Sequence, residues 1–327
     1  MKIGKVPENV LKRSVMKQLH YKRDEVVLGP GIGEDCAALA LAEDEILVMS
    51  TDPITGTAKD IGKLAIQITA NDLASAGAEP IGVMLTILLP DGTREIALKR
   101  IMAQMECACR EAKMQILGGH TEVTAVVNQP VVNVAGVAKA KKGSLISTAG
   151  ARAGMDIVVS KWVGIEGTMI FAKEKEAELK EHFPADFVDT AIGFDRYLSV
   201  VPEAAVATQS SVAAMHDVTE GGLFGALWEM AEASGVGLEI DLKKIPIRQE
   251  TVEICEYFDV NPYGLISSGM MLMASADGNA LVLALQEAGI PATVIGKATE
   301  GNDRVIIRDE ERRFLEPPKT DELYKVL

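Results

Sequence analysis

Four aspartates and one glycine-rich segment are the residues of this sequence whose types and spacing could do phosphate chemistry. Residues 28–39 have the sequence LGPGIGEDCAAL, in which Gly31 and Gly33 alternate with other residues and Asp35 follows. Glycines let backbone N–H groups approach a phosphate closely, whereas a carboxylate beside a phosphate repels it. A Mg²⁺ ion resolves the conflict, because Mg²⁺ binds carboxylates and phosphate oxygens together. The segment therefore predicts a polyphosphate held by glycine backbone, with its metal on Asp35.

Three further aspartates lie in settings that suit the same metal. Asp52 ends an apolar run of strand length, Asp217 follows a short apolar run, and Asp72 lies inside a predicted helix, where aspartate is unfavourable. Each has an ordinary alternative, namely a turn residue, a helix N-cap and a surface position on an amphipathic helix. Their joint pattern indicates hard-cation ligands and Mg-ATP chemistry, in which positioning and charge neutralisation are the main catalytic terms.

The composition argues against several classes of function. The formal net charge of −14 disfavours nucleic acid and anionic membranes as main partners. No apolar run approaches the roughly 18 residues of a membrane span, and the polar N-terminus lacks the apolar stretch of a secretory signal. Only four cysteines are present, which fits reduced thiols. We expect a cytoplasmic protein.

Hydrophobic periodicity predicts an α/β (α+β) protein with two domains, residues 1–145 and 146–327, divided near a polar, glycine-bearing stretch. The sequence predicts helices over residues 6–20, 61–76, 93–113, 167–207, 223–233 and 279–288. It predicts strands over residues 46–50, 80–90, 131–140, 155–160, 237–242, 270–275 and 292–296.

Five segments carry a resemblance to a known family. GPGIGEDCAAL, STD at 50–52, GKLAIQITANDLASAGAEP at 62–80, GGHTEV at 118–123 and HDVTEGGL at 216–223 resemble the aminoimidazole ribonucleotide synthase superfamily, in family order and across nearly the whole chain. The resemblance implies a two-domain fold whose N-terminal domains pair into a dimeric β-barrel, hence a homodimer. It also implies that ATP binds near that interface, and that the residues matching the family's metal-binding aspartates hold Mg²⁺: Asp35, Asp52, Asp72 and Asp217.

Within the superfamily, the chain looks most like the hydrogenase maturation protein HypE and HypE-like proteins. This resemblance implies an ATP-dependent, Mg²⁺-requiring enzyme that activates a carbonyl or amide oxygen by phosphorylation. It also implies a role in the maturation of hydrogenase or another metalloenzyme, together with a maturation-protein partner. HypE ends in a cysteine-bearing tail, whereas this sequence ends DELYKVL and its last cysteine is Cys255. We therefore expect a separate small-molecule or protein-borne acceptor. Two alternatives stay open: a small-molecule kinase of the thiamine-monophosphate kinase type, and a non-catalytic nucleotide-binding maturation partner.

The matched motifs supply further candidates. The GGHTEV segment is expected to contact the nucleotide through Gly118, Gly119 and Thr121. Candidates for catalysis are His120, Glu122 and His216, although a histidine is commonly a structural residue.

Four other features have an ordinary structural role as their first expectation. Cys36 is expected to pack as a small hydrophobe, and Cys107 and Cys109 should point to different faces of a helix. Cys255 is expected to be structural. Glu166, near the start of a predicted helix, indicates either a cationic or amide-bearing substrate or a carboxylate that favours the helix dipole.

Overall fold

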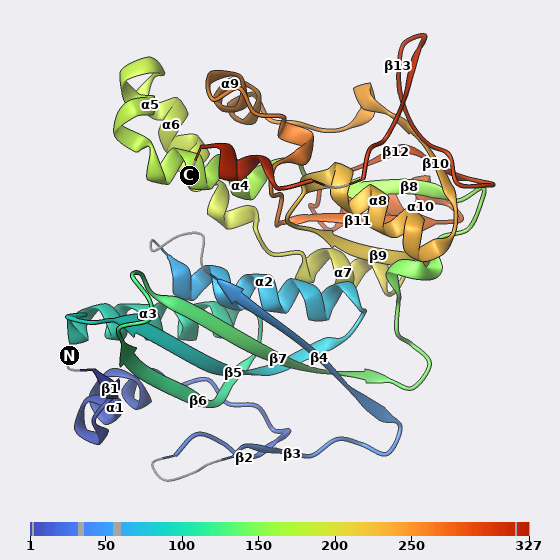
Figure 1. Cartoon of the computed structure of the whole chain (residues 1–327). Helices are drawn as coiled ribbons and strands as arrows, with labels where there is room; N and C mark the ends of the chain where they lie inside the picture. Colours follow the sequence, from blue (N-terminus) through green and yellow to red (C-terminus); the bar gives the residue numbers. More distant parts are fainter. Residues whose placement is uncertain (2, 32–35, 55–59, 318, 327) are drawn as a thin grey trace. The chain divides into compact units, whose positions relative to one another are not determined.

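The computed structural model describes residues 1, 3–31, 36–54, 60–317 and 319–326. The chain forms two compact units, unit 1 with residues 1–74 and 78–145, and unit 2 with residues 75–77 and 146–327 (Figure 1). Each unit combines a β-sheet with α-helices, so the predicted α/β class is confirmed. Among the described residues, no helix is long and apolar enough to cross a membrane.

Unit 1 contains a five-stranded sheet in the order β1-β6-β5-β7-β4. Strands β5 and β6 are parallel, and the other neighbouring pairs are antiparallel. The bounds of the sheet strands are β1 Gly4–Lys5, β4 Glu45–Ile54, β5 Glu79–Pro90, β6 Gln115–Thr124 and β7 Val131–Lys141. A separate short hairpin consists of β2 (Val26–Leu28) and β3 (Ala38–Leu39). The helices are α1 Glu8–Ser14, α2 Ile61–Ser75 and α3 Glu95–Glu111.

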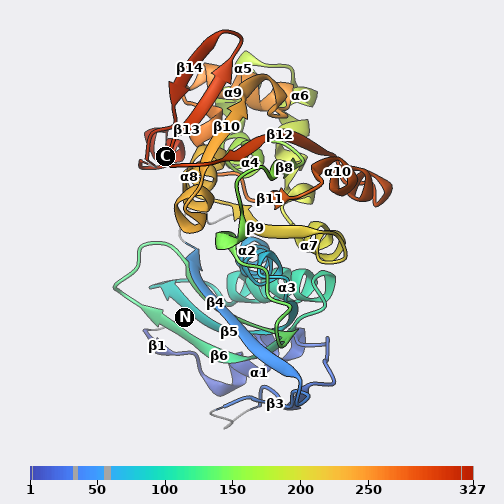
Figure 2. The same cartoon turned by 90° about the vertical axis from the view of Figure 1, so that its right-hand side faces the viewer.

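Helices α2 and α3 cover one face of this sheet (Figures 1 and 2). Side-chain burial alternates along β5 as a sheet covered on one face requires: Leu85 and Ile87 are buried, whereas Thr86 between them is exposed. Helix α2 packs directly on β7 at Gly136, where a Cβ atom would lie 2.3 Å from Cγ2 of Thr69. The sheet therefore has a helix-covered inner face and an outer face.

Unit 2 contains a seven-stranded sheet in the order β14-β13-β10-β12-β8-β11-β9. Its strands are β8 Asp156–Ser160, β9 Val212–Val218, β10 Gly237–Asp241, β11 Met270–Ser275, β12 Ala292–Thr299, β13 Arg304–Arg308 and β14 Glu311–Phe314. Its helices are α4 Ile165–Glu174, α5 Glu176–His182, α6 Ala185–Ile192, α7 Val201–Ala207, α8 Gly222–Ser234, α9 Gln249–Tyr257 and α10 Gly278–Glu287.

One core of unit 2 lies between α8 and the sheet. Leu223, Leu227 and Met230 of α8 pack there with Ile157 of β8 and Leu272 of β11. Sequence analysis did not predict α9 or the β13–β14 hairpin. Helix α9 carries a mixed polar pattern, and all four residues of β14 are exposed, so neither has the periodicity that marks a buried element.

Three motifs lie inside strands where sequence analysis placed them at strand ends. Strand β4 continues beyond Ser50 through Asp52 and Pro53 to Ile54. Pro53 is tolerated because β4 is an edge strand, so a missing N–H costs no ladder hydrogen bond on its open side. In the same way, β6 contains the whole GGHTEV segment up to Thr124, and β9 contains His216 and Asp217.

Candidate functional site

The predicted metal ligands of unit 1 are described in part. Gly33 and Asp35 belong to residues 32–35, which lie outside the described part of the chain. Asp52 lies on β4 and Asp72 on α2. The arrangement around these two aspartates can therefore be established from the structure, whereas the place of Asp35 stays a prediction.

Asp52 and Asp72 belong to the same face of the sheet. The hydroxyl of Ser50 donates a hydrogen bond to Oδ2 of Asp72, so Ser50 points to α2. Asp52 is two residues further along the strand and therefore shares the face of Ser50. Its cross-strand partner, Val134, is fully buried on that inner face. The unusual aspartate inside α2 is thus explained by a polar partner on the neighbouring strand.

The side chains of this inner face offer carboxylate and hydroxyl oxygens, which are ligand types that suit a hard cation such as Mg²⁺. Asp217, the fourth predicted ligand, lies on β9 in unit 2. Within the described residues, no three side chains of the His, Cys, Asp or Glu type form a group that could hold a metal. Asp52 and Asp72 lie on one side of the unit 1 sheet, and their role as metal ligands stays a prediction.

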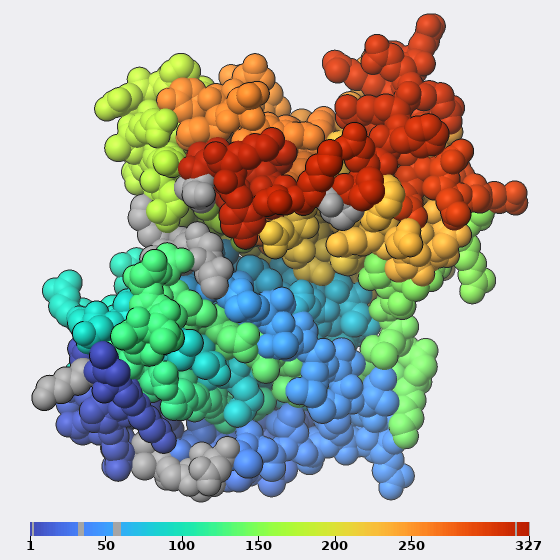
Figure 3. Space-filling view, viewed as in Figure 1, coloured from blue at the N-terminus to red at the C-terminus, as the bar shows by residue number. Residues whose placement is uncertain are grey.

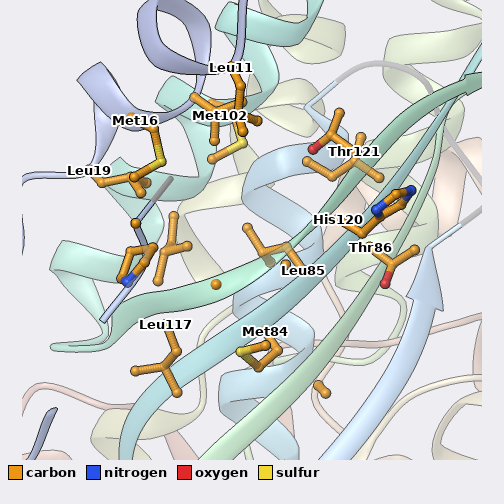
Figure 4. A pocket seen from close by; sticks show the side chains of 18 of the residues that line it. Leu11, Met16, Leu19, Met84, Leu85, Thr86, Met102, Leu117, His120 and Thr121 are labelled. Atoms are coloured by element: carbon orange, nitrogen blue, oxygen red, sulfur yellow. The ribbon is translucent and has the colours of Figure 1, made fainter. Parts of the chain in front are cut away.

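A cavity of about 460 Å³ lies in unit 1. Leu11, Met16, Leu19 and Met102 form an apolar end, and Thr86, His120 and Thr121 form a polar end (Figure 4). Its lining includes four residues that sequence analysis assigned to the nucleotide, which are Gly31, Gly118, Gly119 and Thr121. Lys5 also lines the cavity and has no ion-pair partner among the described residues. The cavity thus combines an apolar end with a cation and exposed backbone.

Gly119 is required by the close approach of β6 to β5. Its φ of +147° is one that residues with a side chain rarely adopt, and a Cβ atom there would lie 2.0 Å from the carbonyl oxygen of Leu85. The register of the two strands also shifts between Val83 and Met84. The glycine therefore allows a local irregularity in the sheet at the wall of the cavity.

His120 and Glu122 form a pair, with 3.0 Å between Nε2 and Oε2. His120 is exposed and Glu122 is half-buried on the outer face. His120 lies opposite Thr86, which in turn lies opposite Asn133 of β7. The amide of Asn133 donates to the hydroxyl of Thr51 over 3.3 Å. A polar row thus crosses four strands on the face opposite Asp52 and Asp72.

Sequence analysis missed Thr86, Asn133 and Lys5. Strand alternation could have placed Thr86 on the outer face, but nothing in the separate segments predicts that it lies beside His120. Strand register decides that proximity, and register comes from tertiary pairing.

The two residues of the HDVTEGG segment that were predicted to act in a site lie on opposite faces of the unit 2 sheet. Successive residues of a strand alternate, so His216 and Asp217 diverge. His216 Nε2 lies 2.8 Å from Oε2 of Glu229 on α8, so the imidazole contacts a helix of its own unit. Asp217 is buried opposite Met271 of β11.

Glu166 is a buried residue of the first turn of α4. Burial raises its pKa to about 7, and the neighbouring Ser268 partly opposes that effect. Its Oε2 atom makes no hydrogen bond to any described residue. A carboxyl that is buried in this way is not a surface carboxylate serving the helix dipole.

The C-terminal segment contributes a residue that sequence analysis did not single out. The carboxylate of Asp321 is 2% exposed and accepts hydrogen bonds from the backbone N–H groups of Gly221, Ile266 and Leu323. The Gly221 and Ile266 donors fix this segment to the rest of unit 2, and the Leu323 donor is an N-cap contact within the segment.

The cysteines divide into two exposed and two buried residues. Cys36 is exposed and lines the unit 1 cavity, so the prediction that it packs as a small hydrophobe is wrong. Cys107 is exposed and Cys109 is buried, so the predicted divergence on the helix is confirmed. Cys255 is buried as predicted, and burial raises its pKa to about 12.

Comparisons with known proteins follow the same two-part division. The N-terminal domain of AIR synthase related proteins matches residues 33–140, and the C-terminal domain matches residues 152–309. The putative hydrogenase expression/formation protein of Methanocaldococcus jannaschii is 29% identical over 99% of this chain and 97% of its own length. Carbamoyl dehydratase HypE of Cupriavidus necator is 32% identical over 82% of this chain and 77% of its own length.

A solved structure shows the same fold. The hydrogenase maturation protein HypE in complex with ATP superposes with a TM-score of 0.82 at 22% identity, covering 98% of this chain and 97% of that one. The domain matches, the extent of the HypE similarity and the shared fold agree with the resemblance seen in the motifs. The chain belongs to the AIR synthase related protein family, in which its relatives include HypE.

Proposed function

We propose that this protein is an ATP-dependent, Mg²⁺-requiring enzyme of the HypE type, which activates a carbonyl or amide oxygen by phosphorylation. The observation that carries the proposal is the 460 Å³ cavity of unit 1, because it gathers Gly31, Gly118, Gly119 and Thr121 with the cation of Lys5. The relatives named as carbamoyl dehydratases support the reaction class.

In unit 1, different residues would bind the nucleotide and the metal. At the cavity, backbone at Gly118 and Gly119 and the ammonium of Lys5 would bind the anionic nucleotide. On the inner face, Asp52 and Asp72 would hold Mg²⁺, which supplies neutralisation of phosphate charge. Because Mg²⁺ acts on phosphate oxygens that it contacts, the proposal requires the phosphates to reach the inner face, whose residues Leu85 and Ile87 also line the cavity.

The chemistry requires an acceptor oxygen close to the γ-phosphate. That oxygen attacks phosphorus, ADP leaves, and the acceptor carries the phosphoryl group. His120 lines the cavity and is paired with Glu122, so this pair could orient an acceptor or move a proton. We propose a separate small-molecule or protein-borne acceptor rather than a thiol of this chain. Cys109 and Cys255 are buried, and intact mass after turnover would reveal an adduct on the exposed Cys36 or Cys107 and so contradict the proposal.

The first experiment is calorimetric titration of the full chain with ATP, with and without Mg²⁺. We expect binding in both cases and tighter binding with the metal. Absence of ATP binding under both conditions would remove the proposal. The second experiment follows phosphorus by ³¹P NMR during turnover with carbamoylated or amide acceptors. Released inorganic phosphate supports the HypE type, whereas a phosphoryl group retained on the product supports a small-molecule kinase.

We also propose that two copies of unit 1 pair through the outer face. Leu47 and Met49 of the edge strand β4 are 48% and 63% exposed on that face, and an apolar open strand favours pairing with another strand. Light scattering should give a dimer mass at micromolar concentration, and Met49→Lys should shift it toward the monomer. A monomer for the unaltered chain would contradict the homodimer.

A further inference from the structure

Unit 2 contains a second cavity, of about 270 Å³, which the proposed reaction does not use. Its walls come from the start of α8, the β13–β14 hairpin and the C-terminal segment. Figure 3 shows that segment, in red, along the surface of unit 2 next to α8. This volume is below the 300–1,000 Å³ that is typical for drug-sized ligands, so a ligand of about one ring fits it.

The charges around this cavity leave one cation without a partner. Two carboxylates line it, but Glu316 forms an ion pair with Lys319, and Glu322 forms an ion pair with Lys325. Arg313 also lines it and has no ion-pair partner among the described residues. The exposed guanidinium of Arg313 at this cavity wall is therefore available to an anionic ligand.

A second arginine faces the same region. Arg313 lies opposite Ile306 in the β13–β14 ladder, and Arg308 is two residues beyond Ile306, so both arginines belong to one face of the hairpin. Both lie close enough to Tyr263 to lower the pKa of its hydroxyl against the raising effect of burial. Arg308 likewise forms no ion pair with a described residue.

The cavity also has an aromatic wall. Phe224 of α8 lines it, and Tyr263 stacks on Phe224 with ring centroids 5.1 Å apart and an interplanar angle of 15°. The guanidinium of Arg313 lies 5.8 Å from the Phe224 ring centroid. A ring held by stacking and flanked by a cation is suited to a planar ligand that carries negative charge.

We propose that this cavity binds a small planar anion, a single aromatic or heteroaromatic ring that carries a phosphate or carboxylate group. The ring packs on Phe224, and the anionic group pairs with Arg313, with Arg308 as the neighbouring cation. Asp321 fixes the wall formed by the C-terminal segment by accepting the backbone N–H groups of Gly221 and Ile266. The site belongs to unit 2 alone and does not depend on the proposed reaction of unit 1.

The test is calorimetric titration of the full chain with phenyl phosphate, compared with inorganic phosphate and with phenol. We expect phenyl phosphate to bind more tightly than either fragment. Arg313→Ala should weaken its binding about tenfold, since hydrogen bonds to charged groups contribute about 1.5–3 kcal/mol. Arg312→Ala is the matched control, because Arg312 is the adjacent residue on the other face of β14 and pairs with Glu239.

Phe224→Leu should also weaken phenyl phosphate binding while leaving inorganic phosphate unaffected. Thermal melting confirms that each variant is folded, and the arginine variants remain informative if Phe224→Leu does not fold. The proposal is overturned by any of three results: no binding of phenyl phosphate, equal affinity for either fragment, or equal loss in Arg313→Ala and Arg312→Ala. Phenyl phosphate could also bind in the unit 1 cavity. Only a loss of phenyl phosphate affinity in Arg313→Ala therefore supports binding in the unit 2 cavity.

Discussion

Two segments of similar composition have opposite roles in the two units. GGHTEV in β6 and HDVTEGG in β9 and the turn before α8 each contain a histidine, a threonine, a glutamate and paired glycines. In unit 1, Gly118, Gly119 and His120 line a cavity. In unit 2, His216 is paired with Glu229, and the Gly221 N–H donates to Asp321 over 2.6 Å. Both segments border a cavity, since Gly221 lines the unit 2 cavity, but the N–H of Gly221 is already bound by Asp321.

The two glycine pairs show why composition does not decide the role. Gly119 permits close approach of two strands, with its neighbours left facing a cavity. Gly222 has a φ of +61°, and a Cβ atom there would lie 2.7 Å from the carbonyl oxygens of Tyr263 and Leu265. Gly119 and Gly222 therefore both permit close backbone packing, and composition alone does not separate the two segments. The comparison teaches that a ligand motif has to be judged by what already occupies its donors.

The largest expected effect is on stability and comes from a buried ion pair of unit 2. Lys161 is buried, donates to the carbonyl oxygens of Tyr197, Ser199 and Gly269, and pairs with Glu203 over 2.6 Å. Lys161→Met leaves a buried carboxylate without its counterion, so we expect a loss of about 3–5 kcal/mol in unfolding free energy by urea denaturation. Adding Glu203→Leu should recover much of that loss. A stability unchanged by Lys161→Met would contradict the structural role.

The next effect is a pH dependence carried by Glu166. Its pKa is raised by burial from an ordinary 4.5 to about 7, so the folded chain binds the proton more tightly than the unfolded chain. The resulting stabilisation is fully present below pH 4.5 and is lost as pH rises through 7, by about 3 kcal/mol in total. Glu166→Gln should remove this slope between pH 4.5 and 7, measured by urea denaturation. The exposed Glu300→Gln serves as control, and an unchanged slope in Glu166→Gln would exclude the assignment.

Asp52→Asn tests the metal role of the inner face of unit 1. We expect Mg-ATP binding to weaken about tenfold, the lower end of what the loss of a supporting group costs a metal site. ATP without metal should bind with nearly unchanged affinity, because the carboxylate acts through the cation. Asp91→Asn, an exposed loop position of the same unit, is the matched control in calorimetry. Unchanged Mg-ATP affinity in Asp52→Asn would remove this residue from the metal site.

The two histidines test the comparison directly. His120→Ala should weaken ATP binding or turnover about fivefold, the effect of one hydrogen-bonding group in a site. His216→Ala should leave both unchanged and lower stability by under about 1 kcal/mol, because its pair with Glu229 is partly exposed. Calorimetry and thermal melting separate these outcomes. Loss of ATP binding in His216→Ala, with none in His120→Ala, would contradict the distinction between the two segments.

The smallest effect concerns thiol accessibility. Iodoacetamide should label Cys36 and Cys107 in the folded protein, whereas Cys109 and Cys255 should react only after unfolding, because burial raises their pKa and blocks access. ATP should slow labelling of Cys36 at the cavity and leave Cys107 unaffected, measured by peptide mass mapping. Equal protection of both exposed thiols would argue against nucleotide in the cavity.

Much of the fold was predictable from the sequence, and the failures have a common cause. Helix α2 and strand β5 were predicted because apolar spacing and flanking glycine or proline mark them locally. The β13–β14 hairpin was missed because its outer strand is fully exposed and carries no alternation. The end of β4 was placed too early, because nothing local indicates that an edge position tolerates Pro53.

The sequence by itself determined the α/β class, the family and the residue types suited to Mg²⁺ and phosphate, because these depend on local periodicity and on motifs in order. Only the tertiary structure decided that Asp52 joins Ser50 and Asp72 on one face while His120 lies on the other. It alone decided that Cys36 is exposed and that Asp321 satisfies the Gly221 N–H, 100 residues away. Register and long-range packing set these outcomes, and neither is encoded in any single segment.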